Sequence, residues 1–312
     1  MRKVWPWLQM LAGLAIIGVL FWKVGTQSFV DSLRLVNPGN ILAALGIGMG
    51  TTVASAWRWC LVARRLGLEL TLPQAVSDYY RAQFLNSVLP AGIVGDAHRA
   101  WKHGKQEGDI ARGVKAVVLE RVAGQAVLIA VGVAVLLSTP SLLPGGAQDI
   151  VWVIVVAAAL AVVTFAVSRR LARRGSGLRR TLDDVRIGLL SSRTWPGVGL
   201  LSLAGLCGNI TLFVVAADAT GLHATVGQLL PLAVLSLFAM SLPLNVGGWG
   251  PREGVTALAF GAAGLGAAQG LTTAVVYGVL ALVSTLPGAL VLVAQAPVVQ
   301  RWEKKRYATG SN

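Results

Sequence analysis

The sequence predicts an all-α polytopic membrane protein with about seven or eight transmembrane helices and two re-entrant, Pro/Gly-broken helical elements. Its residues are 55% hydrophobic, and its mean hydropathy is +0.68. Several apolar runs are long enough to cross a hydrocarbon core of about 30 Å, which needs roughly 20 residues per helix. Basic residues gather in some of the connecting segments and avoid the others, and this asymmetry sets the orientation.

The expected spans account for most of the chain. The first follows Arg2 and Lys3 and ends without a small-residue cleavage site, so we interpret it as a retained signal anchor. With so many helices in 312 residues, we expect a single integral membrane domain over 1–312 and no soluble catalytic domain. The predicted spans are Trp5–Trp22, Ile41–Val62, Val114–Leu137, Ile150–Val167, Val198–Ala219, Val226–Leu242 and Leu271–Ala294.

The net charge of +14 is distributed as in an inner-membrane protein. A basic chain could bind nucleic acid, but here the charges follow the positive-inside rule, so we expect no nucleic-acid partner. Both termini are then cytoplasmic, and the protein lies in the cell inner (cytoplasmic) membrane. Trp57 and Trp59, near a span end, fit an interfacial aromatic belt. Lys and Arg gather in 64–112, 169–193 and the tail 297–312, whereas 23–39, 138–149 and 220–225 contain only Lys23 and Arg34.

A first break in the apolar pattern lies at about 72–96. The segment 72–94 is too apolar for an ordinary loop, yet it contains Asp78, Arg81 and Pro90. Because basic clusters flank it on both sides, the chain enters from the cytoplasmic side and returns there. We predict a re-entrant hairpin that turns at 89–96.

A second break, at about 242–254, has the sequence LPLNVGGWGPREG. Backbone that is not helical cannot face lipid, so this segment must line a cavity enclosed by protein. The region 226–268 is either two crossings or a second hairpin that enters from the opposite face. The two breaks can be aligned with a one-residue gap, which is typical of a transporter with paired broken helices. The alternative is that Pro and Gly end two unrelated helices.

Charged residues at both breaks are candidate ligands for an anionic group. Arg252 and Glu253 follow Pro251, which suits the first turn of a helix whose N-terminal N–H groups attract anions. Arg99 and Arg81 occupy a comparable place at the first break, and a guanidinium donates two hydrogen bonds to phosphate. The alternative for Arg252 is an internal salt bridge with Glu253, and for Arg99 it is a solvated place in the cytoplasmic cluster.

Adjacent charges also occur inside a predicted span. Glu120 and Arg121 lie about two turns into the third span and point about 100° apart, so at least one should face a central cavity. The alternative for Arg121 is snorkelling to the interface. Asp96 is a counter-ion or a helix cap. Asn86, in the first break, and Trp249, in the second, complete the candidate substrate-binding set.

The sequence contains no catalytic constellation, so we expect neither an enzyme nor a bound metal or cofactor. His98, His103 and His223 match no metal-ligand spacing with each other or with cysteine. No phosphate-binding GxxxxGK[ST] loop is present, and the glycine clusters do not follow strands.

At these motifs the chain resembles the flippase-like transmembrane family typified by the N-terminal membrane domain of lysylphosphatidylglycerol synthetase. The resemblance implies a polytopic bundle with re-entrant helices that moves lipids between leaflets. Full synthetases similar to this chain continue into a soluble aminoacyl-transfer domain, whereas this chain stops soon after Lys305, so we expect no synthetase activity from it alone. The motifs are Arg81 with Phe84-Leu85-Asn86, Leu89-Pro90 with Gly95-Asp96 and Arg99, Glu120-Arg121, and Leu242-Pro243 with 247–253.

The leading hypothesis is a lipid translocator for an anionic phospholipid or a polyprenyl-phosphate-linked lipid. Its partners are then membrane lipids with anionic headgroups. The alternative is a non-transporting membrane subunit that anchors or regulates a separate lipid- or glycan-modifying enzyme through its basic loops. Gly/Ala-rich faces permit a homo-oligomer without requiring one.

Overall fold

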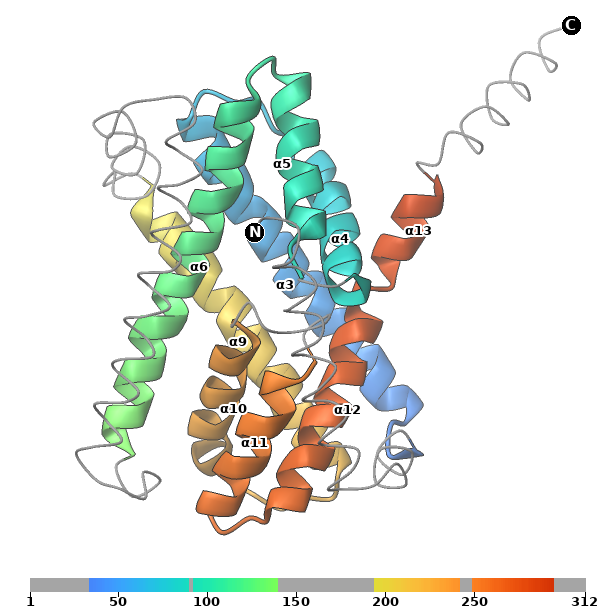
Figure 1. The fold of residues 1–312 in the computed structure, drawn as a ribbon, viewed down its shortest axis with the longest axis vertical. Coiled ribbons are helices and arrows are strands. Elements are labelled where there is room, and N and C mark those ends of the chain that lie inside the picture. Colours follow the sequence, from blue (N-terminus) through green and yellow to red (C-terminus); the bar gives the residue numbers. More distant parts are fainter. Residues whose placement is uncertain (1–33, 90–91, 140–193, 242–248, 295–312) are drawn as a thin grey trace, which may run out of the picture.

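The computed structural model describes residues 34–89, 92–139, 194–241 and 249–294, and these segments are built from α-helices without an extended strand (Figure 1). The predicted spans Trp5–Trp22 and Ile150–Val167 lie outside the described residues. In chain order the helices are α3 (Pro38–Arg65), α4 (Leu72–Val88), α5 (Val94–Gln106), α6 (Ile110–Ser138), α9 (Trp195–Ala219), α10 (Val226–Met240), α11 (Pro251–Ala262), α12 (Ala267–Thr285) and α13 (Pro287–Ala294).

Four helical segments are long and apolar enough to cross a membrane, which confirms a multi-pass protein. They are α3, α6, α9 and the continuous stretch Ala267–Ala294 formed by α12 and α13. The 28 residues of α3 extend over about 42 Å, more than the hydrocarbon core requires. The predicted span Val226–Leu242 is different, because helix α10 has 15 residues and extends over only about 22 Å.

Helix α3 lies at the centre of the bundle and packs against α4, α6, α9 and α12. Two apolar cores flank it. One, which includes Phe213, Phe260 and Tyr277, joins α9, α10, α11 and α12. The other, which includes Trp59 and Tyr79, joins α3, α4 and the first half of α6. Trp59 is fully buried in this second core, so its assignment to an interfacial belt was wrong, whereas Trp57 is half exposed.

Helices α4 and α5 form a helical hairpin at the first break, and its re-entrance into a membrane stays a prediction. Helix α4 ends at Val88, α5 begins at Val94, and the two pack against each other; residues 90 and 91 lie outside the described part. Gly95 makes this packing close, because a Cβ there would collide with the backbone of Ala82. The side-chain oxygen of Asn86 accepts the Gly95 N–H at 2.8 Å and ties the start of α5 to α4. Helix α5 also contains His98 and His103.

Helices α10 and α11 form a second hairpin. Thr225 and Gln228 cap the start of α10, and Pro251 begins α11, as its position in the sequence predicts. At about 22 Å and about 18 Å, both helices are shorter than a membrane crossing. Residues 242–248 of the break lie outside the described residues.

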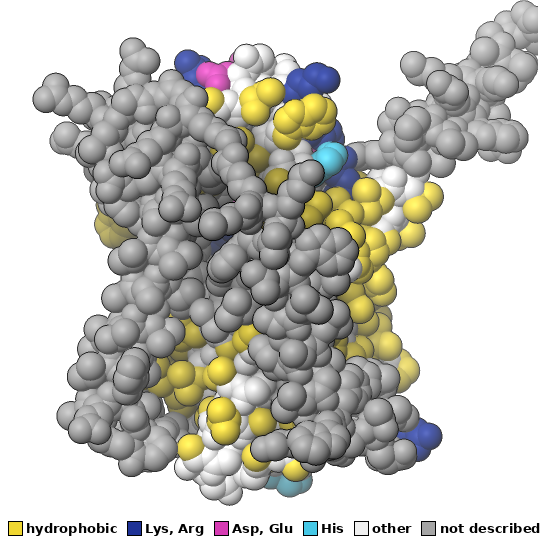
Figure 2. Space-filling view, in the orientation of Figure 1, with side chains coloured by type: hydrophobic (Ala, Val, Ile, Leu, Met, Phe, Trp, Pro, Cys, Tyr) yellow, Lys and Arg dark blue, Asp and Glu magenta, His cyan; other side chains and the backbone are white. Residues whose placement is uncertain are grey.

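The two hairpins lie at opposite ends of the molecule, and their turns point towards its middle (Figure 1). On the face drawn in Figure 2, Lys and Arg side chains gather mostly at the end where α5 leads into α6, and apolar side chains line much of the right-hand side below them. The bundle therefore places two short helix pairs between longer apolar helices, with their turns inside.

Candidate functional site

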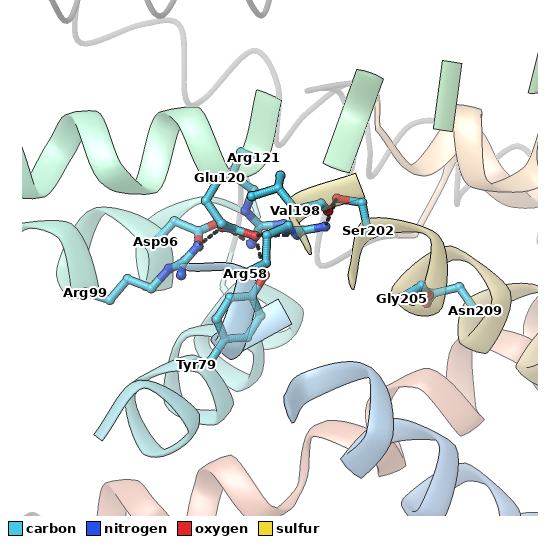
Figure 3. Close-up of polar contacts among 10 residues, drawn as sticks. All are labelled: Arg58, Tyr79, Asp96, Arg99, Glu120, Arg121, Val198, Ser202, Gly205 and Asn209. Atoms are coloured by element: carbon cyan, nitrogen blue, oxygen red, sulfur yellow. Dashed lines mark hydrogen bonds and ion pairs between the residues drawn. The ribbon is translucent and has the colours of Figure 1, made fainter. Parts of the chain in front are cut away.

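Five charged side chains from three helices form a continuous ion network at the turn of the α4–α5 hairpin. Arg58 (α3) donates from Nε to Glu120 Oε1 (α6) at 3.0 Å, and Arg99 Nη2 (α5) lies 2.7 Å from Glu120 Oε2. Arg99 Nε lies 2.8 Å from Asp96 Oδ1, and Arg121 Nη2 (α6) lies 2.5 Å from Asp96 Oδ2. Figure 3 shows the side chains meeting in this order, so that positive and negative charges alternate. Three arginines against two carboxylates leave one surplus positive charge.

The network is buried at one end and open at the other. Arg99 and Glu120 are fully buried, and Arg58 is 7% exposed. The side chain of Asp96 is 14% exposed and that of Arg121 is 46% exposed. Because ions are strongly destabilised inside an apolar bundle unless paired, the alternation explains how these charges are accommodated. A ligand from outside would meet Arg121 and Asp96 first.

Neutral groups fix the inner end of the network. The Tyr79 hydroxyl donates to Glu120 Oε1 at 3.2 Å, and Arg58 Nη1 donates to Ser202 Oγ at 3.0 Å. Ser202 in turn donates to the carbonyl of Val198 at 2.7 Å. Arg58 Nη2 also donates to Glu120 Oε1. With four donors on its two oxygens, the Glu120 carboxylate has little capacity for a further ligand.

Arg99 is held mainly by aromatic rings. Its guanidinium carbon lies 4.7 Å from the ring centroid of Trp59 and 4.4 Å from that of Tyr79, within the range of cation–π contact. Its Nε and Nη2 bind the two acids, but Nη1 is buried without a hydrogen-bond partner in the described part of the chain. One strong donor of the network is therefore unused.

Arg81 belongs to a neighbouring ion cluster rather than to this network. Asp78 Oδ1 accepts from Arg81 Nη2 at 2.9 Å and from Lys102 Nζ at 2.7 Å. Asp78 is buried, whereas the Lys102 side chain is 25% exposed. The cluster joins α4 to α5 beyond the turn and stabilises the hairpin.

The second hairpin has an arginine in a similar setting. Arg252 is buried and forms an ion pair with the adjacent Glu253, whose Oε2 accepts the Gly250 N–H at 2.6 Å. The Arg252 guanidinium lies 5.0 Å from the Trp249 ring and 5.2 Å from that of Tyr277. The internal salt bridge considered as the alternative for Arg252 is therefore present. Glu253 both neutralises Arg252 and caps α11.

The structure divides the sequence-predicted candidates into three groups. Arg81 lies in the Asp78 cluster, and Arg252, Glu253 and Trp249 lie together at the start of α11. Glu120 and Arg121 do not pair with each other: Glu120 points inwards and Arg121 reaches Asp96 at the half-exposed end. The network brings together Asn86, Asp96, Arg99, Glu120 and Arg121.

Sequence reasoning missed Arg58, Tyr79 and Ser202. Arg58 could have been found, because it is a charge seven residues inside the end of α3 and Glu120 needs a partner at a similar depth. Only the flanking Trp57 and Trp59 were interpreted, as members of an interfacial belt. Tyr79 and Ser202 carry no sequence signal, since hydroxyl groups of this kind are common in helices.

Comparison with known proteins identifies the family of the chain. No curated protein matches the chain. The profile of the family described as "Lysylphosphatidylglycerol synthase TM region" matches residues 7–288, which include both hairpins and the whole ion network. The chain belongs to this family of lysylphosphatidylglycerol synthase transmembrane regions.

Proposed function

We propose that the protein is an inner-membrane lipid translocator that moves an anionic phospholipid or a polyprenyl-phosphate-linked lipid between leaflets. Membership of a family named for a lipid-modifying synthase supports a lipid substrate. Two short hairpins that turn inside a bundle support a transporter, because paired broken helices characteristically surround a transporter's central site.

The observation that carries the proposal is the surplus positive charge of the ion network. Glu120 is the eleventh residue of α6, so it lies about 15 Å from the start of that helix. Ionisable groups at such depth are costly in a membrane and mark ligand pathways by default. The network opens at Arg121, where the guanidinium fork could receive a phosphate group. The lipid tails would stay in the bilayer while the headgroup crosses through protein.

The second hairpin supports the same transport route from the opposite end. Its arginine is neutralised by Glu253, so it contributes a rigid polar end to α11 rather than a surplus charge. Backbone that is not helical would have to be shielded from lipid, and in this proposal the surrounding spans would provide that shield. The headgroup would therefore pass between two polar turns.

Leaflet exchange in proteoliposomes tests the function. Vesicles contain the purified full-length protein, either wild type or Arg121→Gln, with labelled anionic phospholipid, polyprenyl phosphate or a neutral lipid. Arg112→Gln is the matched control, since it removes one charge from the same helix at an exposed position, where the side chain pairs with Asp109. We expect wild type and the control to exchange an anionic lipid faster than the neutral lipid. Arg121→Gln should exchange the anionic lipid at least tenfold more slowly than wild type.

Two results would reject parts of this proposal. Equal exchange by Arg121→Gln and wild type would remove the network from the pathway. An absence of exchange for the whole lipid panel would reject translocation and favour the partner-subunit alternative. The basic segment invoked by that alternative, 169–193, lies outside the described residues.

A further inference from the structure

Asp96 lies where the surrounding groups would best hold a phosphate. It is the third residue of α5, in the first turn, where the helix N-terminus favours negative charge. Its carboxylate accepts from Arg99 Nε at 2.8 Å, from Arg121 Nη2 at 2.5 Å and from Asn86 Nδ2 at 3.0 Å. Two guanidinium groups and an amide at a helix N-terminus are a donor set suited to a phosphate ester.

The network around this donor set has more positive than negative charge. Among the described residues Arg58, Arg99 and Arg121 pair with the carboxylates of Asp96 and Glu120, which leaves one surplus positive charge. A phosphate group has enough oxygens to accept from Arg99 Nε, Arg121 Nη2 and Asn86 Nδ2 in place of Asp96. The donors that hold Asp96 therefore suit a phosphate as well as they suit a carboxylate.

Asp96 is also the acid of the network that can be displaced from its arginine partners. Both oxygens of Glu120 are held by groups that are themselves almost fully buried, from α3, α4 and α5. Asp96 lies at the open end, beside the half-exposed Arg121. Rotation of the Asp96 side chain would free Arg99 and Arg121 without disturbing the Arg58–Glu120 pair.

We propose that Asp96 occupies a phosphate-binding site in the ligand-free protein, and that the phosphate ester of the substrate displaces it to bind Arg99 and Arg121. This inference deepens the proposed function and rests on it for the identity of the substrate as a lipid. The recognised group is a phosphate, either as the mono- or diester of a lipid headgroup or as free phosphate. Asp96 is a competing internal anion, so it lowers affinity and promotes release.

Equilibrium binding to the purified full-length protein in neutral detergent tests the displacement. The probes are dioctanoyl phosphatidylglycerol, inorganic phosphate and dioctanoylglycerol, which lacks the phosphate. Asp96→Asn removes the competing charge while keeping the side-chain shape. Asp109→Asn is the matched control, because it removes the same charge at the N-cap of α6 and keeps a capping residue.

We expect Asp96→Asn to bind phosphatidylglycerol about tenfold more tightly than wild type, and Asp109→Asn to match wild type. Dioctanoylglycerol should bind no better to Asp96→Asn than to wild type. Tighter binding of inorganic phosphate as well would identify phosphate alone as the recognised group, and tighter binding of the lipid only would identify the headgroup. Unchanged or weaker binding of both phosphate probes by a folded Asp96→Asn protein would overturn the proposal.

A measurement on wild type covers the case in which Asp96→Asn fails to fold. Carbodiimide labelling followed by peptide mass spectrometry reports how accessible each carboxylate is. Phosphatidylglycerol should increase labelling of Asp96 at least threefold and leave Asp109 unchanged, whereas dioctanoylglycerol should change neither. Protection of Asp96, or no change at saturating lipid, would show that it is not displaced.

The binding assays and the leaflet-exchange assay test separate proposals, and either proposal can be rejected without the other. Displacement of Asp96 without leaflet exchange would preserve the phosphate site and reject translocation. Exchange that depends on Arg121, together with unchanged binding by Asp96→Asn, would preserve translocation and reject the displacement.

Discussion

Arg99 Nη2 lies 2.7 Å from Glu120 Oε2, and both side chains are fully buried although they belong to different helices. This pair attaches the α4–α5 hairpin to α6, a helix long enough to span the membrane. Arg58 binds the other oxygen of the same carboxylate and extends the connection to α3. The Glu120 carboxylate thus joins α3, α5 and α6 at one point.

Glu120→Gln should strongly destabilise the protein. The substitution leaves Arg58 and Arg99 buried with one fewer counter-charge, and breaking a buried ion pair typically costs about 3–5 kcal/mol. Thermal unfolding in detergent should show a clearly lower midpoint. Glu107→Gln, at an exposed acid beyond the end of α5, is the control and should unfold like wild type. Equal midpoints for both variants would show that Glu120 does not hold the hairpin in place.

Gly95→Ala should disrupt the α4–α5 hairpin. The added Cβ would overlap the backbone of Ala82, and overpacking of this kind costs about 1–3 kcal/mol. Limited proteolysis should then cleave near the turn. In Gly254→Ala the new Cβ meets no atom within 4 Å, so helix propensity should leave this control as stable as wild type or more stable. Resistance of Gly95→Ala to proteolysis would contradict the close packing.

Arg252→Ala should lose stability as well as any transport activity. Glu253 would remain buried without its cation, although it would still accept the Gly250 N–H. Adding Glu253→Gln removes the stranded charge, so the double variant should recover part of the lost unfolding midpoint. If the double variant is folded but inactive in leaflet exchange, Arg252 acts in transport and not only in folding. Additive losses of stability would contradict the pairing.

The protein should lose stability as the pH falls below about 6.5, partly through His103. Burial lowers the pKa of this histidine from its ordinary value of 6.5, although Glu107 and Asp78 act in the opposite direction. The folded protein therefore disfavours protonation, whereas the unfolded chain gains a proton below that value, which lowers the free energy of unfolding.

His103→Phe should reduce this pH dependence and retain the edge-to-face contact with Trp59, whose ring centroid lies 5.5 Å away. The exposed His223→Gln variant serves as control and should keep the wild-type profile. Thermal unfolding of the two variants and wild type between pH 5.5 and about 8 measures the pH dependence of each. Identical slopes for His103→Phe and wild type would exclude His103 as a source of the effect.

Local features of the chain predicted much of the fold. Apolar run length correctly identified α3, α6, α9 and the final span, because a helix that crosses a bilayer needs a fixed length of apolar residues. Pro and Gly correctly located the turn before α5 and the start of α11, because these residues end or begin helices through their own backbone geometry.

The candidate site was predicted only in part. Asp96, Arg99 and Glu120 were selected because charge is unusual in such apolar surroundings, and the structure brings them together. Their partner Arg58 was not selected, because it lies 62 positions before Glu120 in the chain and no local signal indicates the pairing. Trp59 was misassigned for the same reason, since only packing shows that its ring lies on Arg99 in a buried core.

The sequence by itself determined that this is a helical membrane protein, where its helices break and which charges lie within apolar segments. These properties depend on residues that are neighbours in the chain. Only the tertiary structure decided that Glu120 pairs with Arg58 and Arg99 rather than with the adjacent Arg121. Side chains next to each other on a helix point about 100° apart, so the partners of a buried charge depend on which helix faces pack together.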